Sequence, residues 1–154
     1  MSGAVEIERK FLVKELPDLG SLHFLKLMQG YIATSDTEVR LRSDGSKHML
    51  TCKRGSGLTR LESEVEISVE QFDALWPLTE GCRIEKTRYH MDRGEHLVEL
   101  DVYQGSLEPL VVAEVEFASE GASREFAVPD FFAEEVTSDA RYKNKNLAKE
   151  GMPS

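Results

Sequence analysis

Charged and apolar residues alternate along most of the chain, and this period-two pattern constrains the fold more than any other feature. In the segment over residues 5–13, Glu6, Glu8 and Lys10 alternate with residues that include Ile7 and Phe11. Side chains on a β-strand point to opposite faces in turn. The segment is therefore expected to form a strand with one largely apolar face and one face that carries two carboxylates and an ammonium group.

Seven later segments also show strand patterns, which gives eight predicted strands. They cover residues 5–13, 29–34, 38–43, 47–54, 60–67, 83–91, 96–103 and 111–118. Helices are predicted over residues 17–27, from Ser68 onward, and twice in the tail from Pro129 on. Eight strands joined mostly by short turns predict a mainly β (α+β) protein: a closed eight-stranded antiparallel β-barrel with a few peripheral helices. Such a barrel is just wide enough to enclose one small ligand.

The composition indicates a single globular domain over residues 1–154, whose last residues, roughly six, are expected to form a disordered tail. Hydrophobic residues make up 40% of the chain and charged residues 31%, and the net charge of −9 disfavours nucleic acid as a partner. No apolar run is long enough to cross a membrane, and the N-terminus carries no export signal. We therefore expect a cytoplasmic protein with Cys52 and Cys82 reduced. An exposed apolar flank of the barrel would allow a homodimer.

The charges are segregated by strand, which bears on where the charged faces point. Acidic pairs fall on the first, fifth and eighth predicted strands, and basic pairs fall on the third and sixth. Such faces usually point to solvent, but a solvent face normally mixes charge types along each strand. If they instead line the barrel, the interior must hold a compensating polyanion with its metal, because each buried ion costs several kcal/mol. Arginine and lysine suit phosphate oxygens, and paired carboxylates suit Mg²⁺ or Mn²⁺.

Six charged elements follow one another along the chain: Glu6-x-Glu8-x-Lys10, Arg40-x-Arg42, Lys53, Glu64-x-Glu66, Lys86-x-Arg88 and Glu114-x-Glu116. In this order they resemble the signature of the CYTH superfamily, the triphosphate tunnel metalloenzymes. The resemblance implies a tunnel-shaped antiparallel barrel and an enzyme that acts on triphosphates with a divalent metal. Family members include inorganic, thiamine and RNA triphosphatases and class IV adenylate cyclases. Residues 113–117 and 136–144 are most similar to those of the compact bacterial triphosphatases.

The resemblance also implies a role for each element. The residues expected to bind the substrate phosphates are Lys10, Arg40, Arg42, Lys53, Lys86 and Arg88. The residues expected to bind metal are Glu6, Glu8, Glu114 and Glu116, with Glu64 and Glu66 serving a second metal or positioning water. Tyr31 corresponds to a tyrosine assigned as proton acceptor in small bacterial members, although a structural role fits it equally. A carboxylate at Glu6 or Glu8 that orients a metal-bound water is the alternative.

The expected reaction is hydrolysis of inorganic tripolyphosphate to pyrophosphate and phosphate with Mg²⁺ or Mn²⁺. The alternatives are a class IV-type adenylate cyclase, a thiamine triphosphatase, and a non-catalytic module that binds polyphosphate or nucleotides. The expected partner is a small-molecule triphosphate, with no nucleic acid and no membrane. Lys143 and Lys145 are expected on a solvated helix face, and the alternative is that they reach the mouth of the tunnel.

Overall fold

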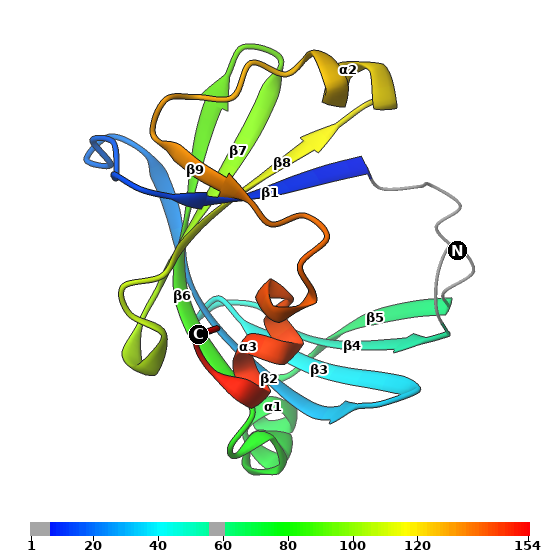
Figure 1. The fold of residues 1–154 in the computed structure, drawn as a ribbon. Coiled ribbons are helices and arrows are strands. Elements are labelled where there is room, and N and C mark those ends of the chain that lie inside the picture. Colours follow the sequence, from blue (N-terminus) through cyan, green and yellow to red (C-terminus); the bar gives the residue numbers. More distant parts are fainter. Residues whose placement is uncertain (1–6, 56–60) are drawn as a thin grey trace.

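The computed structural model describes residues 7–55 and 61–154, and its main feature is one strongly curved antiparallel sheet (Figure 1). Within these residues the sheet has nine strands in the order β5-β4-β3-β2-β6-β7-β8-β1-β9. The strands are β1 (Ile7–Val13), β2 (His23–Thr34), β3 (Thr37–Ser43), β4 (His48–Arg54), β5 (Leu61–Ile67), β6 (Arg83–Arg93), β7 (His96–Tyr103), β8 (Val111–Phe117) and β9 (Phe132–Glu135).

The mainly β, antiparallel architecture with few helices is confirmed, and all eight predicted strands form. The expectation of a fully closed barrel is not met in the described ranges, because the sheet ends at β5 and β9. The added strand β9 explains the difference. It pairs with β1 through Phe11–Glu135 and Val13–Phe132. A closed barrel would need this edge of β1 to pair with β5, but β9 already occupies it.

Within residues 7–55 and 61–154, three α-helices and three short 3₁₀ helices accompany the sheet. They are α1 (Val69–Leu75), η2 (Trp76–Thr79), η3 (Gly105–Leu107), α2 (Glu120–Glu125), η4 (Ala140–Tyr142) and α3 (Asn144–Glu150). The helix predicted from Ser68 is confirmed, since Ser68 and Gln71 form a capping box. The second tail helix is also confirmed, and α3 reaches Glu150, inside the stretch expected to be disordered. No helix among the described residues has the length and apolar character needed to cross a membrane.

Two predicted helices are wrong, and strand pairing is the reason in both cases. The helix predicted over residues 17–27 does not form: residues 17–22 lie in a loop, and β2, which begins at His23, pairs with β6. The first tail helix is replaced by β9, where Phe132 packs on Phe11 with ring centroids 4.9 Å apart. The spacing of apolar residues in both segments favoured a helix. In the fold, however, both segments gain backbone hydrogen bonds and apolar contacts by pairing with a neighbouring strand.

The apolar residues form two clusters that leave the charged faces inside the curl. One cluster packs the outward faces of β1, β7 and β8 beneath the segment that contains α2 and β9, with Leu100 and Val115 fully buried. The other gathers residues such as Ile84 and Tyr103 around Leu147 of α3, which lies on the concave side of the sheet (Figure 1). The inward charged faces therefore line a space that α3 closes at one end.

Candidate active site

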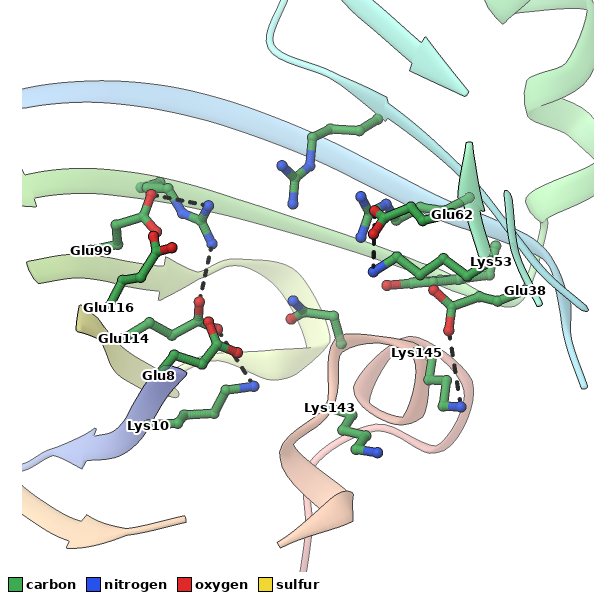
Figure 2. A pocket seen from close by; sticks show the side chains of 15 residues that line it. Glu8, Lys10, Glu38, Lys53, Glu62, Glu99, Glu114, Glu116, Lys143 and Lys145 are labelled. Atoms are coloured by element: carbon green, nitrogen blue, oxygen red, sulfur yellow. Dashed lines mark ion pairs between the residues drawn. The ribbon is translucent and has the colours of Figure 1, made fainter. Parts of the chain in front are cut away.

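A cavity of about 420 Å³ lies on the concave side of the sheet, and its described lining is almost entirely ionic (Figure 2). Seven basic and six acidic residues line it together with Tyr31 and Asn144. The charged residues are Lys10, Arg40, Arg42, Lys53, Arg88, Lys143, Lys145, Glu8, Glu38, Glu62, Glu99, Glu114 and Glu116. The charged faces therefore enclose the cavity, as the strand-by-strand segregation of charge indicated.

Carboxylates form one wall of this cavity. Strand pairing sets Glu8 of β1 opposite Glu116 of β8, and Glu99 of β7 opposite Glu114 of β8. Figure 2 shows these four side chains pointing into the same part of the cavity. Lys10, opposite Glu114, holds its Nζ 3.5 Å from that carboxylate and donates a hydrogen bond to the Tyr142 carbonyl at 3.1 Å. The predicted partnership of Glu8 with Glu114 and Glu116 is thus present, while Glu6 lies outside the described residues.

Guanidinium groups form the facing side. Arg40 and Arg42 project from β3, and Gln29 accepts a hydrogen bond from Nε of Arg42 at 2.9 Å. Burial lowers the pKa of Arg42, and the positive charges of Arg40 and Arg88 lower it further. The Nε of Arg40 is buried and has no hydrogen-bond partner in the described parts of the chain. Crowded cations with an unused buried donor favour an incoming anion.

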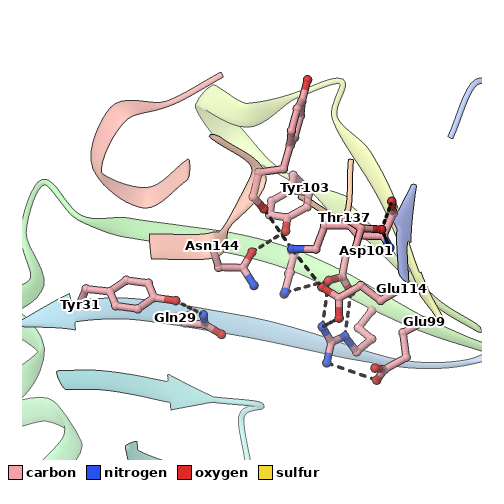
Figure 3. A network of polar contacts seen from close by, with 12 residues as sticks. Gln29, Tyr31, Glu99, Asp101, Tyr103, Glu114, Thr137 and Asn144 are labelled. Carbon is pink, nitrogen blue, oxygen red and sulfur yellow. Dashed lines mark hydrogen bonds and ion pairs between the residues drawn. The ribbon is translucent and has the colours of Figure 1, made fainter. Parts of the chain in front are cut away.

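A buried ion network supports the cavity from behind (Figure 3). Asp101 and Lys86 are fully buried, and their charged atoms lie 2.8 Å apart. Arg88 donates two hydrogen bonds to Asp101, at 2.8 and 2.9 Å, and also lies 3.2 Å from Glu99. One carboxylate therefore fixes both cations of the Lys86-x-Arg88 element. Of the two cations, only Arg88 lines the described cavity, whereas Lys86 contacts Asp101 behind it.

The network moves the pKa values of its members in opposite directions. Burial alone would raise the pKa of Asp101, but the charges and hydrogen bonds of Lys86 and Arg88 lower it to about 2. Burial lowers the pKa of Lys86 to about 8 although Asp101 opposes this shift. The pKa of Arg88 is raised, because the hydrogen bonds and charge of Asp101 outweigh its burial. All three groups are consequently charged near neutral pH.

Acid should therefore unfold the protein partly through Asp101. Its folded pKa of about 2 lies below the unfolded value of 3.8, so the stability from its charge is present above pH 3.8 and is lost as the pH falls toward 2. The expected loss is about 2 kcal/mol. Urea unfolding at several pH values measures it. Asp101→Asn should remove that part of the acid dependence; an unchanged dependence in the variant would contradict the assignment.

Several predicted site residues lie elsewhere, and several lining residues were not predicted. Glu64 and Glu66 do not line the described cavity; Glu64 lies 3.8 Å from Arg40 and accepts a hydrogen bond from Thr51. Lys143 and Lys145 do line it, which agrees with the alternative that they reach the tunnel mouth; Lys143 is nevertheless exposed to solvent, and Lys145 lies 3.9 Å from Glu38. The lining residues absent from the predicted set are Glu38, Glu62, Glu99, Lys143, Asn144 and Lys145.

The position of Asp101 could have been found from the sequence. The turn at residues 92–94 sets the β6–β7 register, which places Arg88 opposite Asp101 and Lys86 opposite Tyr103. A carboxylate on the charged face beside two cations is the natural partner for both. Glu62 follows similarly from the β4–β5 register, since it lies opposite Lys53. No such rule places α3, because its contacts depend on how the tail folds back into the curl.

Comparison of the chain with known protein families and with known relatives shows its family. The model of the CYTH domain matches residues 4–152. The chain belongs to the CYTH domain family. An inorganic triphosphatase from Nitrosomonas europaea is 53% identical over 147 residues, which cover 93% of this chain and 96% of that protein. An inorganic triphosphatase from Acetivibrio thermocellus is 41% identical over 147 residues, covering 94% and 93% respectively.

Solved structures agree with the family assignment. A structure of an inorganic triphosphatase, 49% identical, superposes on this CYTH domain with a TM-score of 0.81 and covers 98% of both chains. A putative adenylate cyclase from Bacillus halodurans, 19% identical, has a TM-score of 0.56 and covers 78% of this chain and 84% of that one. The second likeness shows the shared fold alone.

The CYTH cavity has a donor set that fits a hard divalent cation. Among the described residues, no three His, Cys, Asp or Glu side chains form a ready-made metal cage. Magnesium seldom uses such cages, because it keeps several waters and binds through one or two carboxylates together with substrate phosphates. Glu8 and Glu116 line the same cavity as Arg40 and Arg42. The carboxylates provide oxygen ligands for a metal, and the arginines beside them can bind a phosphate group. The residues present therefore fit Mg²⁺ or Mn²⁺ shared with an anionic substrate.

Proposed function

We propose that this CYTH protein is a metal-dependent triphosphatase that hydrolyses inorganic tripolyphosphate to pyrophosphate and phosphate. The observation that carries the proposal is the pairing of a carboxylate wall with crowded guanidinium groups in one cavity, where Arg40 has a buried donor without a partner among the described residues. The names of the two curated relatives support the substrate. The free Cys52 and Cys82 thiols agree with a cytoplasmic setting.

The basic residues hold the substrate in this proposal. Arg40, Arg42 and Lys53 bind phosphate oxygens from one side, while Lys10 and Arg88 bind them beside the carboxylates. Phosphoryl transfer depends mainly on such positioning and on electrostatic stabilisation of the charge that develops on the phosphate oxygens. Lys86 contributes as a positioning residue, because it shares Asp101 with Arg88 and so fixes the carboxylate that orients the guanidinium group.

The carboxylates hold the metal and direct the water. Glu8, Glu114 and Glu116, together with Glu6, would hold Mg²⁺ or Mn²⁺, and the bound metal would neutralise phosphate charge and acidify water. Glu64 and Glu66, which do not line the described cavity, would serve a second metal or position water. The water oxygen bonds to a terminal phosphorus and the bridging P–O bond breaks. One proton of the water stays on the new phosphate, and the other is transferred to pyrophosphate. Glu8 is the proposed residue that orients the water.

Tyr31 is better suited to donate a hydrogen bond than to accept a proton. It is 4% exposed, and its hydroxyl accepts a hydrogen bond from Gln29 at 2.7 Å (Figure 3). Burial raises the pKa of the phenol, and the nearby Arg40 charge offsets this only in part. The phenol therefore keeps its proton at neutral pH, which favours the carboxylate alternative for water activation.

Tyr31→Phe should consequently lower kcat by about 10- to 100-fold, the effect of losing one hydrogen bond to a charged group. The pH dependence of kcat should keep its shape, because the proposed base is a carboxylate. Steady-state rates between pH 6 and 10 measure both. If the variant instead loses an alkaline inflection that the wild type shows, Tyr31 is the proton acceptor.

The proposed reaction is tested by phosphate release from purified protein with Mg²⁺ or Mn²⁺ and a panel of tripolyphosphate, ATP and thiamine triphosphate. Tripolyphosphate should be the best substrate, and Glu8→Gln should lower kcat by at least about 100-fold. Glu120→Gln is the matched control, since Glu120 is exposed on α2, away from the cavity lining, and pairs with exposed Arg124. Release no faster than in a boiled sample would refute a triphosphatase. Cyclic AMP and pyrophosphate from ATP would indicate a cyclase instead.

A further inference from the structure

A second, smaller cavity of about 210 Å³ adjoins the first and takes no part in the proposed chemistry. The two cavities share three lining residues, Arg42, Arg88 and Glu99. These three form a boundary, since Arg88 lies 3.2 Å from Glu99 and the charge of Arg88 acts on Arg42. We refer to the smaller cavity as the second chamber.

The strand directions place the second chamber at the end of the curl away from α3. β3 and β6 flank β2 on either side, and both are antiparallel to it, so they run in the same direction. Their first residues approach α3, as Lys145 lies 3.9 Å from Glu38 and Leu147 packs with Ile84. Continuing past Arg42 and Arg88 leads to Asp44 and His90, which line the second chamber. The ionic cavity is thus bounded by α3 at one end and continues in the opposite direction toward the second chamber.

The chemistry of the second chamber differs from that of the first. Its walls are partly apolar, from Leu25, Leu27 and Met49, and beyond the boundary Lys47 is the basic residue among its described lining. Lys47 follows a turn that Asp44 holds in place, since its carboxylate accepts hydrogen bonds from the backbone N–H groups of Ser46 and Lys47 at 2.8 and 2.7 Å. A passage with two arginines at its inner end and one lysine on its outer turn can attract a small anion without retaining it strongly.

We propose that the second chamber is the exit for the inorganic phosphate released from the substrate, with Lys47 binding the departing dianion on its way out. This inference rests on the proposed function, because it names the route of one product of that reaction. A single tetrahedral phosphate suits the chamber, whose volume is half that of the main cavity. Pyrophosphate, with more negative charge, remains among the greater number of cations in the main cavity.

Inhibition by added inorganic phosphate tests the exit. Phosphate should inhibit tripolyphosphate hydrolysis noncompetitively, and Lys47→Gln should weaken that inhibition by up to about tenfold, the loss of one charge-assisted contact from an exposed lysine. Met49→Trp, which fills the chamber, should lower kcat and KM together by about tenfold and leave kcat/KM little changed, because the slowed product release follows the chemical step. Lys26→Gln is the matched control, since Lys26 is exposed on β2 between the chamber residues Leu25 and Leu27.

A binding measurement separates failure of the exit from failure of the proposed function. Calorimetric titration of the resting protein with inorganic phosphate requires no turnover, and Lys47→Gln should weaken that binding about tenfold. If no triphosphate is hydrolysed but phosphate binding depends on Lys47, the chamber stands as a phosphate site and the triphosphatase is refuted. If hydrolysis proceeds but phosphate inhibits competitively, or if Lys47→Gln and Met49→Trp both behave like Lys26→Gln, the exit is refuted. Circular dichroism melting confirms that each variant is folded.

Discussion

Asp101→Ala is expected to lower the free energy of unfolding by about 3–5 kcal/mol, because it leaves Lys86 and the guanidinium of Arg88 without their shared buried carboxylate. Removing one partner of a buried ion pair costs more than the pair contributes, since the remaining charge is still removed from water. Urea unfolding monitored by circular dichroism measures the loss. Asp92→Ala, in an exposed position near the end of the same strand as Lys86, should change stability by less than about 0.5 kcal/mol.

A double variant tests whether the unpaired charge is the cause. Lys86→Met removes the buried ammonium group, so combining it with Asp101→Ala should recover at least about 1 kcal/mol of the loss. If the double variant is as unstable as the sum of the two single variants, the two residues do not interact as the structure places them. A loss below about 1 kcal/mol in Asp101→Ala alone would show that the network adds little to stability.

Glu114→Gln is expected to lower kcat/KM for tripolyphosphate by at least about 100-fold and to raise the Mg²⁺ concentration needed for half-maximal rate. Glu114 holds a central position among the charged groups, 3.5 Å from Lys10 and 4.0 Å from Arg88, and glutamine keeps its shape while removing its charge. Initial rates at a series of Mg²⁺ concentrations measure both effects.

The control for this change is Glu85→Gln, since Glu85 is exposed on β6 next to the buried Lys86. It should retain the wild-type rate and metal dependence. If Glu114→Gln loses activity while its dependence on Mg²⁺ stays that of the wild type, Glu114 positions Lys10 and Arg88 instead of binding metal. If both variants behave like the wild type, the carboxylate wall is not part of the active site.

The predicted strands and their inward charges came from period-two alternation, which is a local property and therefore visible in the sequence. Arg40 and Arg42 line the cavity because they share one face of β3 with Glu38, and Lys53 lines it because it lies opposite Glu38 on β4. Lys86 lies on the charged face of β6 and yet its side chain is fully buried. Its burial depends on tertiary packing, because the Tyr103 ring lies against its ammonium group and α3 packs nearby. Alternation gives the face of a strand, and tertiary packing decides which residues on that face reach the cavity.

The elements that the sequence did not predict depend on contacts between residues that are far apart in the chain. β9 forms because it pairs with the edge of β1 and because Phe132 packs on Phe11. The spacing of the apolar residues in the sequence predicted a helix here, since neither contact is visible locally. Residues 143–145 reach the cavity because Tyr103 donates a hydrogen bond to Asn144 at 2.6 Å and Leu147 is buried among strand residues (Figure 3). Each is a long-range contact between the tail and the sheet.

The proposed function is tested most directly by following tripolyphosphate with ³¹P nuclear magnetic resonance in the presence of the protein and Mg²⁺. The proposal predicts that the tripolyphosphate signals are replaced by pyrophosphate and phosphate in equal amounts, and that a chelator stops the conversion. Tripolyphosphate that stays intact with the folded protein and either metal would contradict the account. Conversion that continues unchanged in excess chelator would contradict the role of the carboxylate wall.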